Sequence, residues 1–316
     1  MKIPENFKYK SVLITGGTGF FGKNIVPILE KNGVSVVATG RDYDLTSWEK
    51  AEELFKLKKY DLIIHAAAFQ GAGDFTLKYP ADQFFKNNLI HTNTLECWKR
   101  FQPQARLVGI GSTCSYPGNK VVLSEEDYFT GPLHPSVEIY GLTKCNMQQG
   151  IKAYKQQYGL KGTTLVFATL YGPHDEFDIS RSHVVSALVQ KFCDAKKNGD
   201  EKVEVWGDGS QTRELIYVED QILGLLKSVD YDGDLLNIGT GVETSIKELA
   251  EKIKLLSEFE GKIWYNTNRF VGVRKKVLDI SKAKEYCGWT VKNKMNGLEE
   301  GLLKTIKWYE ENEQGD

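Results

Sequence analysis

Hydrophobic residues in the first half of the chain fall into short runs, and most of these runs are separated by longer segments with helical spacing. The runs are rich in β-branched residues, as buried parallel strands are. We expect strands at residues 10–15, 34–39, 61–68, 105–111 and 162–169. Helices are expected at residues 23–32, 79–100 and 138–150. This alternation predicts an α/β protein with a doubly wound parallel sheet and right-handed crossovers.

Three glycines follow the first expected strand and precede the first expected helix. Gly16, Gly19 and Gly22 have the spacing G-x-x-G-x-x-G, which permits a tight turn and a close approach to a ligand. Free N–H groups and the dipole at the helix start favour a pyrophosphate. We therefore expect a dinucleotide here rather than a plain turn. The expected contacts are Gly16, Thr18, Gly19, Phe20, Phe21 and Gly22.

The choice of dinucleotide depends on residues about 20 positions further along. Arg41 follows the second expected strand, and an arginine there suits the 2′-phosphate of NADP. Asp42 beside it would suit the 2′-hydroxyl of NAD, so NADP is expected and NAD is less favoured. Asp44 and Leu45 are expected to contact adenine, with a surface turn as the alternative. The other expected cofactor contacts are Ala66, Ala67 and Ala68 after the third strand, and Asn87 in the following helix.

The pattern is less regular after residue 172. Helical spacing returns at residues 180–196, 245–256 and 295–310, and apolar strands are expected at 203–206 and 235–239. We expect a dinucleotide-binding domain of residues 1–172, to which residues 214–241 return. A smaller, interleaved α/β substrate domain is expected from residues 173–213 and 242–316.

Tyr140 and Lys144 stand four residues apart in an expected helix, so they share one helix face. We expect the lysine charge to lower the pKa of Tyr140 and to make this tyrosine a proton donor at neutral pH. The spacing alone is weak, because Tyr116 and Lys120 repeat it, but Pro117 places that second pair in a loop. The alternative is a half-buried tyrosine beside a solvated lysine.

Composition narrows the range of functions. With 41% hydrophobic residues the chain can bury large cores, and a net charge of −1 gives no basic field for nucleic acid or a membrane surface. Five cysteines without a Cys-x-x-Cys pair argue against a disulfide framework and a structural zinc ion, so no metal is expected. The sequence has neither the apolar core of a signal peptide nor a run of roughly 18 apolar residues. We expect a soluble cytoplasmic protein with a small-molecule partner.

The glycine loop, Ser112, Tyr140 and Lys144, in this order, resemble the extended short-chain dehydrogenase/reductase family, and the resemblance spans essentially the whole chain. It implies a Rossmann-type fold. Other segments are similar to the GDP-fucose synthase branch of that family. These segments are residues 79–82 with Asn87, 111–117, 171–175, 182–183, 206–207 with 213–214, and 276–279.

The resemblance implies an NADPH-dependent C4-reductase with C3/C5-epimerase capacity that acts on a GDP-4-keto-6-deoxy-sugar, either a hexose or a heptose. Ser112 would hydrogen-bond the C4 carbonyl, Tyr140 would protonate it, and Lys144 would hold the nicotinamide ribose. Cys114 and His183 match the epimerisation pair. Because a C4 ketone acidifies the hydrogens on C3 and C5, a thiolate base and an imidazolium acid on opposite faces would invert these carbons.

The remaining implied contacts concern the substrate and a partner subunit. Arg213 would pair with the nucleotide diphosphate, and the alternative is an ion pair with a nearby acid. Relatives commonly form homodimers through their long helices, so a homodimer is expected. The implied substrate contacts are Thr113, Lys191, Trp206 and Arg213.

The chain departs from the branch at two segments that would lie near the sugar, residues 70–73 (QGAG) and 268–272 (NRFVG). The identity of the sugar therefore stays open, and so does the use of Cys114 and His183. One alternative is a C4-reductase without epimerisation on a related nucleotide sugar. Others are a nucleotide-sugar 4-epimerase or dehydratase that retains NAD, and a protein that senses NADP without catalysis.

Overall fold

The large sheet of the computed structural model, which describes residues 1–71, 75–178, 181–269, 271, 273–291 and 296–312, has six strands in the order β11-β6-β4-β3-β1-β2. All neighbouring strands run parallel, so the predicted doubly wound parallel sheet is confirmed. The strands are β1 (Ser11–Thr15), β2 (Ser35–Thr39), β3 (Leu62–His65), β4 (Arg106–Ser112), β6 (Gly162–Phe167) and β11 (Leu235–Ile238). The chain adds β2 on one side of β1 and β3 on the other, and ligands bind at such a reversal in open sheets.

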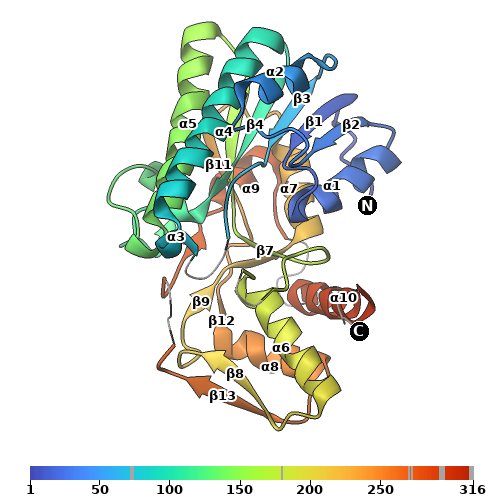
Figure 1. The fold of residues 1–316 in the computed structure, drawn as a ribbon, viewed down its shortest axis with the longest axis vertical. Helices are drawn as coiled ribbons and strands as arrows, with labels where there is room; N and C mark the ends of the chain where they lie inside the picture. Colours follow the sequence, from blue (N-terminus) through green and yellow to red (C-terminus); the bar gives the residue numbers. More distant parts are fainter. Residues whose placement is uncertain (72–74, 179–180, 270, 272, 292–295, 313–316) are drawn as a thin grey trace.

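Two hydrophobic cores cover the two faces of this sheet, because successive strand residues point to opposite faces. Val12 and Ile14 belong to one core, whereas Leu13 between them belongs to the other. On the first face lie α1 (Phe20–Lys31) and α7 (Val218–Ser228), which contact each other. On the second face lie α2 (Trp48–Lys56), α4 (Pro80–Phe101) and α5 (Glu138–Tyr158) (Figure 1).

A second group of elements lies below the large sheet in Figure 1 and packs around three helices. The helices α6 (Val184–Asn198), α8 (Ile246–Leu256) and α10 (Asn296–Asn312) contact one another. They are accompanied by a two-stranded parallel sheet of β8 (Lys202–Trp206) and β13 (Lys262–Asn266). The buried residues of this group continue the hydrophobic core on the first face of the large sheet.

Three further strand pairs join these two groups. They are β7 (Thr169–Tyr171) with β10 (Leu215–Tyr217), β9 (Thr212–Arg213) with β12 (Thr244–Ser245), and β5 (Val122–Leu123) with β14 (Val277–Leu278). The short helices are α3 (Phe75–Lys78), α9 (Ser281–Cys287), η1 (Thr113–Ser115), η2 (Glu125–Asp127) and η3 (Pro135–Val137). No helix in the described ranges is both long enough and apolar enough to cross a membrane.

The sequence analysis assigned no element to α2, α7, α9 or β13. The helix α9 packs against β11 and α7, and Trp289 just after it donates a hydrogen bond to the Gly239 carbonyl at 2.8 Å. Part of the C-terminal segment therefore contacts the large sheet, although it was expected in the substrate domain. The division into two domains itself stays a prediction.

Candidate active site

The glycine loop joins β1 to α1 and leaves no room for side chains. Gly16 has φ +71°, and a Cβ there would lie 2.9 Å from the Ala67 backbone. A Cβ at Gly22 would lie 2.2 Å from the Gly17 carbonyl oxygen. Gly19 is the N-cap of α1 and supplies no side-chain cap, and the first turn carries no acid. The N–H groups at the start of α1 are thus left for an anionic ligand.

The turn after β2 carries the residues that were expected to determine whether NADP or NAD binds. The side chain of Arg41 is exposed, whereas the carboxylate of Asp42 accepts a hydrogen bond from its own turn, from the Gly40 N–H at 2.7 Å. Asp44 likewise accepts from the Thr46 N–H at 2.9 Å. The side chain of Leu45 is only 5% exposed and packs in the core, so its backbone alone remains for the expected adenine contact.

The Asn87 side chain contacts the backbone of Phe69, and its predicted contact with the cofactor stays a prediction. Its amide accepts from the Phe69 N–H at 2.7 Å and donates to the Phe69 carbonyl at 3.1 Å. It therefore fixes the segment that carries Ala66, Ala67 and Ala68, all of which are half-buried at the carboxyl end of β3. Residues 72 and 73 of the first departing segment lie outside the described residues.

Four of the predicted catalytic residues lie where β4 ends and in the first turns of α5: Ser112, Cys114, Tyr140 and Lys144. Ser112 closes β4, and its Oγ accepts from the Cys114 N–H at 3.2 Å. The helix α5 touches this turn directly, because a Cβ at Gly141 would lie 2.2 Å from the Cys114 carbonyl oxygen. Ser115 Oγ also donates to the Gly141 carbonyl at 3.1 Å. This close packing brings Tyr140 near Cys114, although the two residues are 26 positions apart in the sequence.

Lys144 is 2% exposed, which contradicts the alternative of a solvated lysine. Its Nζ donates to the Ile110 carbonyl at 2.9 Å and lies 5.8 Å from the centre of the Tyr140 ring. Burial lowers the pKa of Lys144 to about 8. The predicted lowering of the Tyr140 pKa is wrong for this structure: burial raises that pKa, and the charge of Cys114 adds to the rise. Loss of solvation around the phenolate outweighs the nearby ammonium.

Two more cationic side chains lie next to the Ser112–Cys114 turn. Arg213 Nη1 donates to the backbone carbonyls of Thr212 and Val273 at 2.7 and 2.6 Å. Lys276 Nζ donates to the Thr113 carbonyl at 3.2 Å. Burial lowers the pKa of both cations, whereas the charge of Cys114 raises it, so both lie close to that thiol. Lys276 was not predicted as a site residue, although the sequence motif around it was recognised.

Among the described residues, no carboxylate forms an ion pair with Lys144, Arg213 or Lys276, and their hydrogen bonds go to backbone carbonyls. The alternative of an ion pair for Arg213 is therefore not supported. Positive charges removed from water without a counter-ion are costly, so the arrangement favours an anionic ligand.

His183 is the exposed N-cap of α6. The buried carboxylate of Asp175 accepts hydrogen bonds from Ser186 Oγ in the first turn of that helix and from the Glu176 N–H. Burial raises the pKa of Asp175, and the charge of His183 opposes the rise, so the two side chains are neighbours. In the described parts of the chain no hydrogen bond joins His183 to Cys114.

Lys191 and Trp206 form a separate group at the end of β8. Lys191 Nζ donates to the Glu204 carbonyl at 2.9 Å and lies 5.5 Å from the centre of the Trp206 ring. Arg269 of the second departing segment also contacts this tryptophan, whereas residues 270 and 272 lie outside the described part of the chain. The sequence analysis expected the segment of Arg269 near the sugar but named no role for Glu204, for which the alternating pattern along β8 is the signal.

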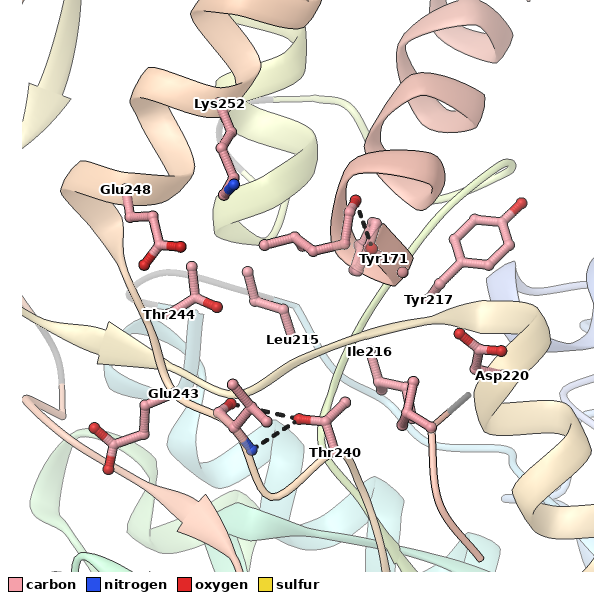
Figure 2. Close-up of a pocket in the computed structure, with 14 residues that line it drawn as sticks. Tyr171, Leu215, Ile216, Tyr217, Asp220, Thr240, Glu243, Thr244, Glu248 and Lys252 are labelled. Carbon is pink, nitrogen blue, oxygen red and sulfur yellow. Dashed lines mark hydrogen bonds between the residues drawn. The ribbon is translucent and has the colours of Figure 1, made fainter. Parts of the chain in front are cut away.

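A cavity of about 160 Å³ lies between β10, α8 and the start of α10 (Figure 2). Its lining includes Tyr171, whose hydroxyl donates to the Leu298 carbonyl at 3.2 Å, and the acidic residues Glu243 and Glu248. None of the predicted site residues lines this cavity. It is therefore separate from the group around Ser112, Cys114 and Tyr140.

The sequence and the fold of this chain are similar to those of known proteins. Residues 12–239 match the family model described as "NAD dependent epimerase/dehydratase family". The chain is 34% identical over 310 residues to GDP-L-fucose synthase 1 of Arabidopsis thaliana, covering 96% of this chain and 94% of the relative.

Two solved structures are similar over almost the whole chain. The GDP-L-fucose synthetase of Naegleria fowleri bound to NADP has a TM-score of 0.87 at 26% identity, over 99% of this chain and 96% of that chain. A GDP-6-OMe-4-keto-L-xylo-heptose reductase from C. jejuni has a TM-score of 0.86 at 26% identity, over 96% and 98%.

Proposed function

The chain belongs to the NAD dependent epimerase/dehydratase family, and on that premise we propose that it is an NADPH-dependent C4-reductase with C3/C5-epimerase capacity. The substrate is a GDP-4-keto-6-deoxy-sugar, a hexose or a heptose. The names of the relatives, GDP-L-fucose synthases and a GDP-heptose reductase, support this choice. The observation that supports the proposal most directly is that Lys144, Arg213 and Lys276 lie around the Ser112–Cys114 turn. Three positive charges there suit an anionic substrate.

The residues at the glycine loop fit NADP. Gly16 and Gly22 leave the close approach that a pyrophosphate requires, and the uncapped start of α1 supplies N–H donors. Arg41 is exposed for a 2′-phosphate, while Asp42 is engaged with its own backbone. NADP-bound and NADPH-containing relatives support the same choice. When bound, NADPH supplies the hydride for C4.

The chain's own residues carry the proton steps of reduction. Ser112 Oγ donates to the C4 oxygen and holds it, and the Tyr140 hydroxyl delivers a proton to that oxygen. Burial keeps the Tyr140 hydroxyl protonated at neutral pH, so the proton is present for this transfer. The Lys144 ammonium offsets negative charge that develops as the tyrosine gives up its proton.

Epimerisation would precede reduction. Cys114 Sγ removes a proton from C3 or C5, and His183 returns a proton to the opposite face. The Ser112 and Tyr140 donors stabilise the enolate oxygen meanwhile. The departing segments and the heptose reductase among the relatives favour a second candidate, a reductase that does not epimerise.

One incubation tests both half-reactions. The full-length protein is mixed with NADPH and GDP-4-keto-6-deoxymannose in deuterium oxide, and the loss of NADPH absorbance is followed. Mass spectrometry and NMR then locate deuterium in the product. We expect NADPH loss with deuterium at C3 and C5; NADPH loss without deuterium selects the reductase, and no NADPH loss with hexose or heptose contradicts the proposal.

The rate of reduction is expected to fall as the pH rises through about 8. The pKa of Lys144 is lowered to about 8, so its ammonium is present below that pH and is lost above it. The phenol keeps its proton across the same range because its pKa is raised. The measurement is kcat/KM for NADPH oxidation from pH 6 to 10, with circular dichroism at each pH as the control for unfolding. A rate that instead climbs through this range contradicts the assignment.

Replacing Arg213 by glutamine is expected to raise KM for the GDP-sugar roughly ten- to hundredfold with a smaller effect on kcat, because a charge-assisted contact to the diphosphate is lost. Steady-state kinetics measures both constants. Lys275→Gln is the matched control, since Lys275 already has an acidic partner, Glu243, at 3.0 Å. An unchanged KM in Arg213→Gln contradicts the diphosphate contact.

A homodimer and a cytoplasmic location stay predictions. The long helices α4 and α5 contact each other on one face of the large sheet. α4 also carries the exposed aromatic side chains of Phe84 and Phe85, which supports a partner subunit at that face.

A further inference from the structure

Glu214 is a buried carboxylate that the proposed mechanism does not use. It stands between β9 and β10, directly after Arg213, and is 3% exposed. Its Oε1 accepts from the Thr240 and Gly241 N–H groups at 2.6 and 2.8 Å and from Thr240 Oγ1 at 3.3 Å. Its Oε2 accepts from the Leu278 N–H at 2.7 Å. A carboxylate offers about four acceptor positions, so these hydrogen bonds use its acceptor capacity.

The loop of residues 239–241 is shaped around this carboxylate. A Cβ at Gly239 would lie 2.3 Å from Glu214 Oε1, so a larger residue there would displace the carboxylate. Gly241 has φ +66°, and two successive N–H groups of this turn point at one anion. Burial raises the pKa of Glu214, and the four hydrogen bonds oppose that rise. The loop therefore stabilises the ionised form of a side chain that belongs to the protein itself.

The hydrogen bond from Leu278 connects Glu214 to the strand β14. The neighbouring N–H groups, those of Val277 and Asp279, donate to backbone carbonyls of residues 121–123 at 2.9 and 3.0 Å. Alternate N–H groups of a strand point to opposite edges, so the Leu278 N–H faces away from β5. Glu214 is its acceptor. The strand β14 is thus held by β5 along one edge and by Glu214 along the other.

Lys276 lies two positions before Leu278 and depends on the position of this strand. Its Nζ donates to the Thr113 carbonyl at 3.2 Å. Burial lowers the pKa of Lys276 and the charge of Arg213 lowers it further, so the two cations lie near each other. Like charges repel, and a lysine side chain is flexible. A fixed backbone at β14 therefore keeps the ammonium at the catalytic turn against this repulsion.

We propose that Glu214 is a positioning residue for substrate binding, because its hold on β14 keeps the Lys276 ammonium next to Arg213 at the catalytic turn. This inference rests on the proposed function, in which both cations face an anionic GDP-sugar. The described hydrogen bonds of the Glu214 carboxylate come from backbone N–H groups and from Thr240, so it acts through the position of β14 and not as a counter-ion. Its effect on substrate affinity is therefore expected to disappear when Lys276 loses its charge.

A double-mutant cycle tests this dependence on Lys276. KM and kcat are measured with the GDP-keto-sugar that the wild-type chain reduces, for the wild type, Glu214→Gln, Lys276→Gln and the double variant. The glutamine carbonyl is expected to stay with the three donors of residues 240–241, so its NH₂ group faces the Leu278 N–H and that hydrogen bond is lost. In the wild-type background, Glu214→Gln is expected to raise KM roughly five- to thirtyfold and to change kcat less than about threefold. In the Lys276→Gln background, it is expected to change KM less than about twofold.

Asp61→Asn is the matched control. Asp61 Oδ2 also accepts from two backbone N–H groups, those of Lys10 and Ser11, both at 2.9 Å. These contacts lie at the amino ends of β1 and β3, at the opposite end of the sheet from the catalytic turn. Asp61→Asn is expected to lower thermal stability and to leave KM unchanged.

The inference is overturned if Glu214→Gln raises KM by the same factor in both backgrounds, because the carboxylate then supports the fold in general. An unchanged KM in folded Glu214→Gln also overturns it. Circular dichroism establishes folding, and if Glu214→Gln does not fold, Gly239→Ala, whose added methyl displaces the same carboxylate, is measured in both backgrounds under the same criteria. These results leave wild-type turnover intact, whereas a wild-type chain that neither binds GDP in calorimetry nor oxidises NADPH with a GDP-keto-sugar rejects the proposed function and the inference with it.

Discussion

Tyr140→Phe is expected to abolish NADPH-dependent reduction, with a loss of roughly 10²- to 10⁴-fold, the range that general acid catalysis supplies. The substitution removes one hydroxyl and leaves the ring, so the packing of α5 against the Ser112–Cys114 turn is kept. Because Lys144 donates to the Ile110 carbonyl rather than to the phenol, its position does not depend on that hydroxyl. The measurement is the single-turnover rate of NADPH oxidation with saturating GDP-4-keto-sugar.

Tyr116→Phe provides the matched control. Tyr116 also stands four residues before a lysine, but its hydroxyl is buried and donates to Asn237 Oδ1. Its loss is expected to lower thermal stability and to leave the rate of the chemical step unchanged. If Tyr140→Phe turns over at the rate of Tyr116→Phe, Tyr140 is not the acid and the proposed mechanism is wrong.

Cys114→Ser is expected to stop deuterium incorporation at C3 and C5 while direct reduction of the unepimerised ketone continues. A serine hydroxyl fits the same space but is not ionised at neutral pH, so it does not replace a thiolate as base. Mass spectrometry of the products in deuterium oxide measures the exchange, and NMR identifies the configuration at C3 and C5.

Each outcome of the Cys114→Ser experiment has a distinct meaning. Loss of deuterium with continued NADPH oxidation supports the division of labour between Cys114 and the Ser112–Tyr140 pair. Unchanged deuterium incorporation shows that another group removes the proton. If the wild-type protein itself incorporates none, the chain is a reductase without epimerase activity, and the heptose is then the substrate to compare with the hexose.

Much of the large sheet could be read from the sequence because the signals are local. Short continuous runs of apolar, β-branched residues mark buried parallel strands, and a spacing of about 3.6 residues marks helices that bury one face. The glycine loop follows from the space that its backbone requires, and the Tyr140–Lys144 spacing follows from helix geometry. These features depend on neighbours within a few residues, so they were predicted with nearly the bounds of β1, β4, β6 and α4. Helix α2 has helical spacing as well, at Trp48, Ala51, Leu54 and Phe55, but the sequence analysis assigned no helix there.

Long-range packing alone decided the electrostatics of the site. Lys276 donates a hydrogen bond to the carbonyl of Thr113, which is 163 positions away in the sequence. Arg213 donates to the carbonyl of Val273, 60 positions away. No sequence pattern reports that these cations converge without a carboxylate. The pKa values of Tyr140 and Lys144 depend on how much water the surrounding elements exclude, which is a property of the folded core. The sequence spacing therefore determined that Tyr140 and Lys144 share one face of the helix. The tertiary structure determined the protonation state of each side chain.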